Sequence, residues 1–214
     1  MDITWHGHAC FSVKGKHATV VTDPFGGVGL KEPKPAADVV LQSHGHDDHN
    51  NLKIVKGDPY VIDLPGEYES RGVMVEGVPT YHDTTEGADR GRNIVFAFSL
   101  DGMHVVHCGD LGHILSDEAV EQIGDVDILM IPVGGHYTID AKGAVEVVKQ
   151  LQPRVTIPMH YDVPGLKLPK KLATVDDFLK EAGAKTVTLD KHTWRVKPAD
   201  LPTEDSVITV FPNP

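Results

Sequence analysis

Cysteine is scarce in this 214-residue chain, which contains only Cys10 and Cys108. Two cysteines so far apart offer neither the spacing of a metal site nor a disulfide framework, and such usage is typical of a reducing compartment. Long hydrophobic runs are also absent, since no segment approaches the ~18 consecutive apolar residues of a membrane-spanning helix. The N-terminus, Met1 to Trp5, lacks a basic segment followed by an apolar one. We therefore expect no signal peptide, no membrane partner and a cytoplasmic protein.

Basic residues are outnumbered, because 20 Lys and Arg stand against 31 Asp and Glu and give a formal net charge of −11. Their densest segment, Lys167 to Lys171, is interrupted by apolar residues. Non-specific nucleic-acid binding depends on Lys and Arg that neutralise phosphates, so we expect no nucleic acid among the partners. With 40% apolar residues, residues 1–214 are expected to form a single domain with a well-buried core.

Histidine is abundant instead, with 13 residues, and three of them fall in the segment His44–His49 (HGHDDH). This segment directly follows the apolar residues Val39 to Leu41. An extended His-x-His places both imidazoles on one face, and the turn that follows brings Asp48 and His49 toward them. Neutral imidazole and carboxylate suit Zn²⁺, Mn²⁺ or Fe. The segment therefore predicts a metal site, with enough ligands to serve two ions.

Other apolar runs end in the same way as the one before His44. The residues that end such runs are Asp23, His44, His82, Asp110 and His160. In layered α/β folds, ligands collect beyond the carboxyl ends of strands. The repeated ending therefore predicts that these side chains converge on one shared site.

The first half of the chain reads as strands and turns, and the second half as strands that alternate with helices. We expect strands at residues 3–5, 10–13, 18–22, 38–42, 60–62, 73–75, 93–100, 104–107, 128–133 and 155–157. The pair Asp101-Gly102 between two apolar runs predicts a tight hairpin. This pattern indicates an α/β (α+β) protein with two sheets and helices on the outside.

Three helices are expected, at residues 116–123, 140–151 and 174–182. Ser116 is the expected cap of the first helix, and Thr174 with Asp177 forms a capping box at the third. The second helix should face inward through Ala144, Val145, Val148 and Leu151. The Pro-rich and acidic tail, residues 198–214, is expected to lie on the surface.

The ordered set of histidines and aspartates resembles that of the metallo-β-lactamase superfamily of metal-dependent hydrolases. The set is His44, His46, Asp48, His49, His82, Asp110 and His160. The likeness covers most of the chain and is greatest to small predicted hydrolases related to the ascorbate-phosphate lactonases. The shared stretches include Gly7–Phe11 (GHACF), Thr22–Pro24 (TDP), Pro65–Glu69 (PGEYE), Gly109–His113 (GDLGH) and Ile157–Tyr161 (IPMHY). The resemblance implies a four-layer αββα sandwich with the metals in a cleft at one edge of the sheets.

The resemblance also implies how the ligands divide between two divalent ions, with zinc favoured and Mn or Fe compatible. It assigns one ion to His44, His46 and His82, and the other to Asp48, His49 and His160, with Asp110 between them. A carboxylate has two oxygens and can bridge two ions, whereas an imidazole offers one lone pair to a metal. Antibiotic-hydrolysing members tend to carry Cys where this chain has Asp110, so the resemblance favours hydrolases of hydroxyacid esters, esters and phosphoesters.

For each of the residues around these predicted ligands, two interpretations of its role are open. Asp23 either orients a ligand imidazole or caps its own turn. His8 and His113, which match family motifs, either approach the substrate and ligands or have structural roles. His136 is either a substrate contact or an exposed loop residue, and Tyr161 either donates to a developing oxyanion or packs in the core.

We expect a dinuclear metal-dependent hydrolase of a small, anionic lactone, ester or phosphodiester. Two divalent ions would lower the pKa of a water between them toward about 7 and so provide hydroxide near neutral pH. Asp110 and Asp48 are the expected catalytic carboxylates, and Asp48 would pass a proton to the leaving group. A metal-binding sensor or scaffold without turnover, and an RNA-processing nuclease, are the alternatives. An assembly of identical chains is compatible with all of these readings.

Overall fold

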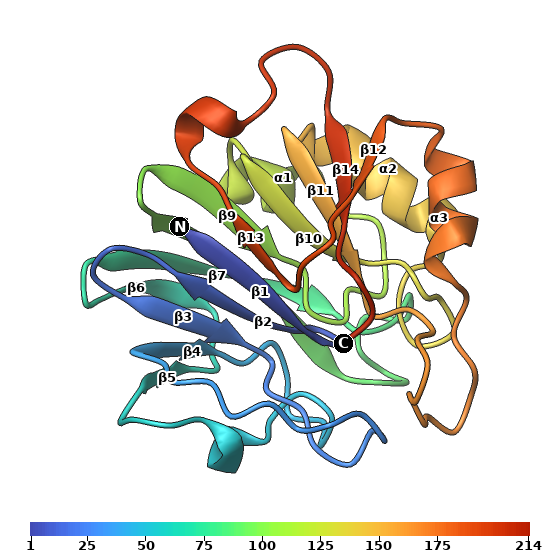
Figure 1. Ribbon diagram of the computed structural model, residues 1–214. Coiled ribbons are helices and arrows are strands. Elements are labelled where there is room, and N and C mark those ends of the chain that lie inside the picture. Colours follow the sequence, from blue (N-terminus) through green and yellow to red (C-terminus); the bar gives the residue numbers. More distant parts are fainter.

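Two β-sheets face each other in the computed structural model, which describes residues 1–214 (Figure 1). The six-stranded sheet has the order β13 (Thr193–Arg195), β1 (Asp2–Gly7), β2 (Cys10–Lys14), β3 (Thr19–Thr22), β4 (Val39–Leu41), β5 (Tyr60–Ile62). The eight-stranded sheet has the order β12 (Thr186–Thr188), β14 (Val207–Val210), β11 (Val155–Met159), β10 (Ile128–Pro132), β9 (Met103–His107), β8 (Arg92–Leu100), β7 (Val73–Tyr81), β6 (Gly66–Ser70).

Large apolar side chains from both sheets fill the space between them. Alternation along β1 buries Ile3 and Trp5, and Phe11, Phe96 and Phe98 are fully buried in the same core. The hairpin predicted at Asp101-Gly102 joins β8 to β9, and both residues have positive φ, at 52° and 76°. A positive φ at both central positions is what a tight two-residue hairpin turn requires. These features confirm the two-sheet prediction.

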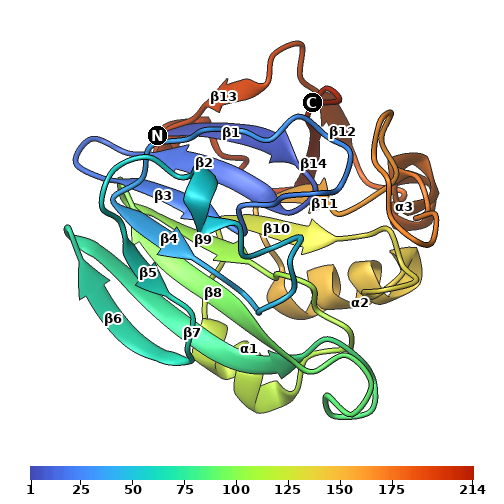
Figure 2. The same ribbon diagram turned by 90° about the horizontal axis from the view of Figure 1, so that it is seen from below.

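Helices cover the face of the eight-stranded sheet that points away from the other sheet, as Figure 2 shows for α1 and α2. The helices are α1 (Asp117–Ile123), α2 (Ala141–Leu151) and α3 (Val175–Ala182), with short 3₁₀ helices η1 (Leu52–Ile54) and η2 (Pro198–Asp200). The αββα sandwich is confirmed, although the layer outside the six-stranded sheet is reduced to loops and η1. The segment from residue 24 to 38 contains three prolines and three glycines, which disfavour an α-helix there.

The first and third helices start at their predicted caps. Ser116 Oγ accepts a hydrogen bond from the amide of Ala119, and the Thr174–Asp177 capping box is present at α3. Helix α2 buries Ala144, Val147 and Leu151, whereas the predicted inward residues 145 and 148 are only half-buried. No helix has the length and apolarity that crossing a bilayer requires.

The prediction that residues 198–214 lie on the surface is wrong. Strand β14 lies between β11 and β12 and pairs with both in parallel. Buried apolar side chains of this segment are Leu201, Ile208, Val210 and Phe211. The Pro and exposed acidic residues at 202–205 hid the strand, although a run of Val, Ile, Thr and Phe follows them. Strands β6, β12 and β13 were also not predicted.

Loss of the Phe211 ring should destabilise the protein, because that ring is 4% exposed and its centroid lies 6.3 Å from that of Phe11. We expect Phe211→Ala to lower the free energy of unfolding by about 3 kcal/mol, measured by urea denaturation. Val187→Ala, at a residue of the same sheet that is 42% exposed, serves as the control and should change little. A loss below about 1 kcal/mol for Phe211→Ala would contradict this packing.

Candidate metal centre

The predicted metal ligands lie together at one edge of the two sheets. Strands β3, β7 and β11 end directly before Asp23, His82 and His160, and β4 ends at Leu41, three residues before His44. Asp110 follows β9, and all five side chains are buried. Parallel pairing of β3 with β4, and of β9, β10 and β11, brings the carboxyl ends of these strands to the same edge. These five residues, each of which ends an apolar run, therefore converge at one edge as predicted.

Donor atoms gather in three groups at this edge, one of which joins Asp23 to His44 and His49. The other two are the candidate sites for two ions. The first consists of His44, His46 and His82, and the second of Asp48, His49 and His160 together with His8. Within each group, one donor atom from each residue lies within 4.8 Å of the others. This division is the same as the one implied by the resemblance, with His8 as the addition. Ligand roles for these residues remain predictions.

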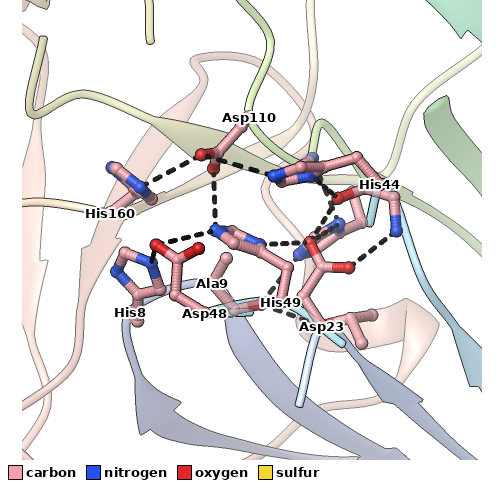
Figure 3. Close-up of polar contacts among 12 residues, drawn as sticks. His8, Ala9, Asp23, His44, Asp48, His49, Asp110 and His160 are labelled. Atoms are coloured by element: carbon pink, nitrogen blue, oxygen red, sulfur yellow. Dashed lines mark hydrogen bonds and ion pairs between the residues drawn. The ribbon is translucent and has the colours of Figure 1, made fainter. Parts of the chain in front are cut away.

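Asp110 lies between the two groups (Figure 3). Its Oδ2 is 3.1 Å from His82 Nε2, 4.0 Å from His44 Nε2 and 3.3 Å from His160 Nε2, and its Oδ1 is 3.3 Å from His49 Nε2. The carboxylate thus faces imidazoles of both groups at once, as a bridging ligand would.

Buried polar atoms at the centre of this cluster lack hydrogen-bond partners. They include His44 Nε2, His49 Nε2 and Asp110 Oδ1. Buried polar groups in proteins are normally satisfied, and a role in binding an ion is one accepted reason for an exception. An array of imidazole nitrogens and carboxylate oxygens is also the donor set that Zn²⁺, Mn²⁺ and Fe²⁺ accept. The residues present therefore fit a metal centre.

Burial and neighbouring charges shift the pKa values of the central groups in opposite directions. Burial lowers the pKa of His44 to about 3, with the nearby His49 acting in the same direction. Burial alone would raise the pKa of Asp110, but His160 and His49 hold it well below its usual value. Burial also opposes protonation of His49, yet Asp110 and Asp23 raise its pKa well above the usual value. In the metal-free protein, these directions favour an ionised Asp110, a neutral His44 and a protonated His49.

Asp23 is placed to orient two of the predicted ligands. This favours the first of the two roles considered for it, over that of a cap of its own turn. Its Oδ2 accepts hydrogen bonds from His49 Nδ1 at 3.0 Å and from Ser43 Oγ at 2.6 Å, and its Oδ1 accepts one from the Ser43 amide. Ser43 Oγ in turn lies 2.9 Å from His44 Nδ1. Holding Nδ1 of each ring leaves Nε2 for a metal, which is the usual arrangement around metal-binding histidines.

Ser43 and Asp83 are site residues that the sequence reading missed. Asp83 directly follows His82, and its carboxylate accepts hydrogen bonds from the amides of Thr85, Gly87, Asp89 and Arg90 and from the Thr85 hydroxyl. These bonds lower the pKa of Asp83 and fix the loop beside a predicted ligand. The only signal in the sequence was the position of each residue next to a histidine of the motif.

Three other candidates lie outside the donor groups. His113 Nε2 accepts a hydrogen bond from the Tyr81 amide and its Nδ1 lies 2.7 Å from the Ile114 carbonyl, so His113 holds the loops together. His136 is exposed. Tyr161 packs against Trp5 in the core, with ring centroids 5.2 Å apart, and burial raises its pKa. These contacts favour the structural interpretations of His113 and Tyr161.

Metal binding should release a proton near neutral pH, because Asp110 and Asp23 raise the pKa of His49, and this ring must be neutral to bind a metal. The affinity for Zn²⁺ should therefore rise as pH increases through the pKa of His49. Calorimetric titrations at pH 7 in two buffers of different ionisation enthalpy measure the proton release. Identical apparent enthalpies in both buffers would contradict the prediction.

Comparisons with known proteins agree with this geometry. A family model for the β-lactamase superfamily domain matches residues 2–160. A UPF0173 metal-dependent hydrolase from Thermoplasma acidophilum is 35% identical over 191 residues, covering 76% of this chain and 84% of that protein. A solved structure from Thermotoga maritima, a predicted Zn-dependent hydrolase of the metallo-β-lactamase superfamily, is 43% identical with a TM-score of 0.80 and covers 98% of both chains.

A more distant structure shares the fold alone. The isothiocyanate hydrolase from Delia radicum gut bacteria is 14% identical, with a TM-score of 0.68 over 92% of this chain and 100% of that one. The family model covers most of the chain, and the relatives align over nearly their whole length. The chain therefore belongs to the metallo-β-lactamase superfamily, as a member of its UPF0173 metal-dependent hydrolases.

Proposed function

We propose that this protein is a dinuclear metal-dependent hydrolase that acts on a small anionic substrate, namely a lactone, an ester or a phosphodiester. The observation that carries the proposal is the position of the Asp110 carboxylate, within 4.0 Å of imidazole nitrogens from two separate donor groups. A carboxylate in that position supports a bridging role between two ions.

The residues present indicate which groups would hold each ion. His44, His46 and His82 would bind one ion, Asp48, His49 and His160 the other, and Asp110 both. When bound, two divalent ions supply a hydroxide nucleophile near neutral pH and polarise the oxygen of the attacked group. Zinc is the metal we favour, and Mn²⁺ and Fe²⁺ are compatible with the same donors.

No side chain of this site is suited to act as the nucleophile. Cys10 and Cys108 are both fully buried, and burial raises the pKa of each thiol, which opposes formation of a reactive thiolate. The only hydroxyl in the network of ligand contacts, Ser43 Oγ, donates to Asp23 and is buried. These features favour attack by water over a covalent intermediate with the protein.

Asp48 has the position expected of a proton carrier. Its side chain is 29% exposed, whereas that of Asp110 is 3% exposed, so Asp48 can reach both the predicted metal group and a bound substrate. We assign to Asp48 the transfer of a proton to the leaving group. Asp110 is enclosed by imidazoles and serves to hold the metals.

The substrate class follows from charge. The chain carries a net charge of −11, so two divalent ions would form a concentrated positive site on a negative protein, and such a site attracts small anions. Nucleic acid is disfavoured as a substrate by the same net charge. A sensor without turnover remains the alternative that an assay must separate.

Hydrolysis assays test the function directly. The protein, loaded with Zn²⁺, Mn²⁺ or Fe²⁺, is assayed with lactones, esters and phosphodiesters, including matched pairs such as 4-nitrophenyl acetate and mono-4-nitrophenyl succinate. We expect metal-dependent turnover and a higher kcat/KM for the anionic member of each pair. Two tightly bound ions without turnover on any substrate would support the sensor, and higher kcat/KM for the neutral members would contradict the anionic class.

Chelation should abolish this activity and leave most of the fold intact, because the apolar core between the sheets does not include the metal ligands. Circular dichroism and activity are measured before chelation, after it, and after metal is restored. Unfolding on chelation would mean that the metals are structural, as in small zinc domains.

Substitution of the two aspartates should distinguish the metal-binding role of Asp110 from the proton-transfer role of Asp48. Asp110→Ala removes the carboxylate between the groups, so at least one ion and all activity should be lost. Asp48→Asn keeps an oxygen for the metal and removes the proton acceptor, so kcat should fall about 10²–10⁴-fold with most metal retained. Equal metal loss in both variants, measured by elemental analysis, would refute the proton-transfer role of Asp48.

A further inference from the structure

His8 is held firmly at the metal centre although it lies far from the HGHDDH segment in sequence. It occupies the turn between β1 and β2, is 1% exposed and has a φ of 52°. Few residues other than glycine adopt this left-handed conformation. Its carbonyl accepts hydrogen bonds from Trp5 Nε1 and from the amide of His160, both at 3.1 Å. An uncommon backbone conformation, fixed in part by a predicted metal ligand, suggests a functional constraint at this position.

Asp48, His49 and His160 are assigned to the second ion only, and the His8 side chain lies against all three. Its Nε2 lies 3.2 Å from Asp48 Oδ2, as Figure 3 shows. Its ring centroid lies 4.2 Å from that of His160 and 4.8 Å from that of His49. An ionised carboxylate can only accept a hydrogen bond, so His8 Nε2 carries the proton and donates it to Asp48.

Asp48 depends on this contact for its orientation. The hydrogen bond with His8 is the only one that the Asp48 carboxylate makes, whereas His49 is held by Asp23 and His44 by Ser43. The Asp48 side chain is also 29% exposed, so water would compete for a carboxylate that had no fixed partner. Metal-binding carboxylates are commonly hydrogen-bonded by a neighbouring group in this way.

A direct ligand role for His8 is the competing interpretation, because His8 lies in the same donor group as Asp48, His49 and His160. Its Nε2 would then have to lose the proton and the contact with Asp48. The observed contact favours an indirect role.

We propose that His8 is a positioning residue that donates its Nε2 proton to Asp48 and so fixes this carboxylate for the ion shared with His49 and His160. The inference rests on the proposed two-metal function and adds the residue that orients one ligand.

Substitution of His8 by Gln or Asn tests this role, because each amide places its N–H donor near a different nitrogen of the original imidazole. The Gln amide nitrogen reaches roughly the place of His Nε2, and the Asn amide nitrogen roughly that of Nδ1. We expect His8→Gln to bind both ions nearly as wild type does, and His8→Asn to bind the second ion about 10–100-fold more weakly. A purely structural role predicts the reverse order, since Asn adopts a positive φ more readily than most residues.

His6→Gln is the matched control, with the same substitution two residues earlier. His6 is half-buried, lies 2.7 Å from Ser12 Oγ and belongs to neither donor group, so both metal affinities should be unchanged. Thermal melts confirm that each variant is folded, and calorimetric titration with Zn²⁺ gives the two affinities. Equal second-site affinities in His8→Gln and His8→Asn, or a weaker second site in His8→Gln, would overturn the proposal.

Nitrogen-15 NMR of the histidine rings separates this inference from the two-metal function. In metal-free protein, His8 should be in the Nε2–H form, with a hydrogen bond that disappears in Asp48→Ala. The Nδ1–H form would refute the positioning role even if two ions bind. A wild-type protein that binds only one ion would refute the dinuclear function, while the NMR result would still decide the His8–Asp48 contact.

Discussion

The buried carboxylate of Asp110 is the charge around which the metal centre is arranged. Its side chain is 3% exposed, and no Lys or Arg forms an ion pair with it. A buried carboxylate without a compensating charge is strongly disfavoured. Compensation therefore comes from imidazoles and, on our proposal, from two metal ions. The raised pKa of His49 is the same effect in the metal-free protein, because a proton there partly replaces a metal.

Close packing of the loops makes this convergence of side chains feasible. A Cβ on Gly112 would lie 2.2 Å from the amide nitrogen of Asp83, and one on Gly134 would lie 2.2 Å from the carbonyl oxygen of His160. Any larger residue at these positions would displace the loops that follow His82 or carry His160. Asp23, Ser43 and, on our proposal, His8 then orient the side chains of the predicted ligands. The sheets thus bring the ligands to one edge, and hydrogen bonds at that edge determine which atoms face the centre.

The sequence predicted those parts of the structure that have a local cause. Each predicted ligand follows or lies near an apolar strand, and the helices have recognisable caps, so the fold class and the converging residues could be inferred. Strand β14 was missed, because the Pro and acidic residues before it resemble a surface tail and because no local pattern encodes its pairing with β11 and β12. The contacts of Asp23 with Ser43 and of His8 with Asp48 span 20 and 40 residues of sequence, and no local pattern encodes them.

The position of the metals relative to Asp110 tests the account most directly. Crystals of the zinc-loaded protein, with anomalous diffraction measured on both sides of the zinc absorption edge, would locate each ion. The account predicts two zinc peaks about 3.5–4 Å apart, one on each side of the Asp110 carboxylate. A single peak, or a second peak away from Asp48, His49 and His160, would contradict it.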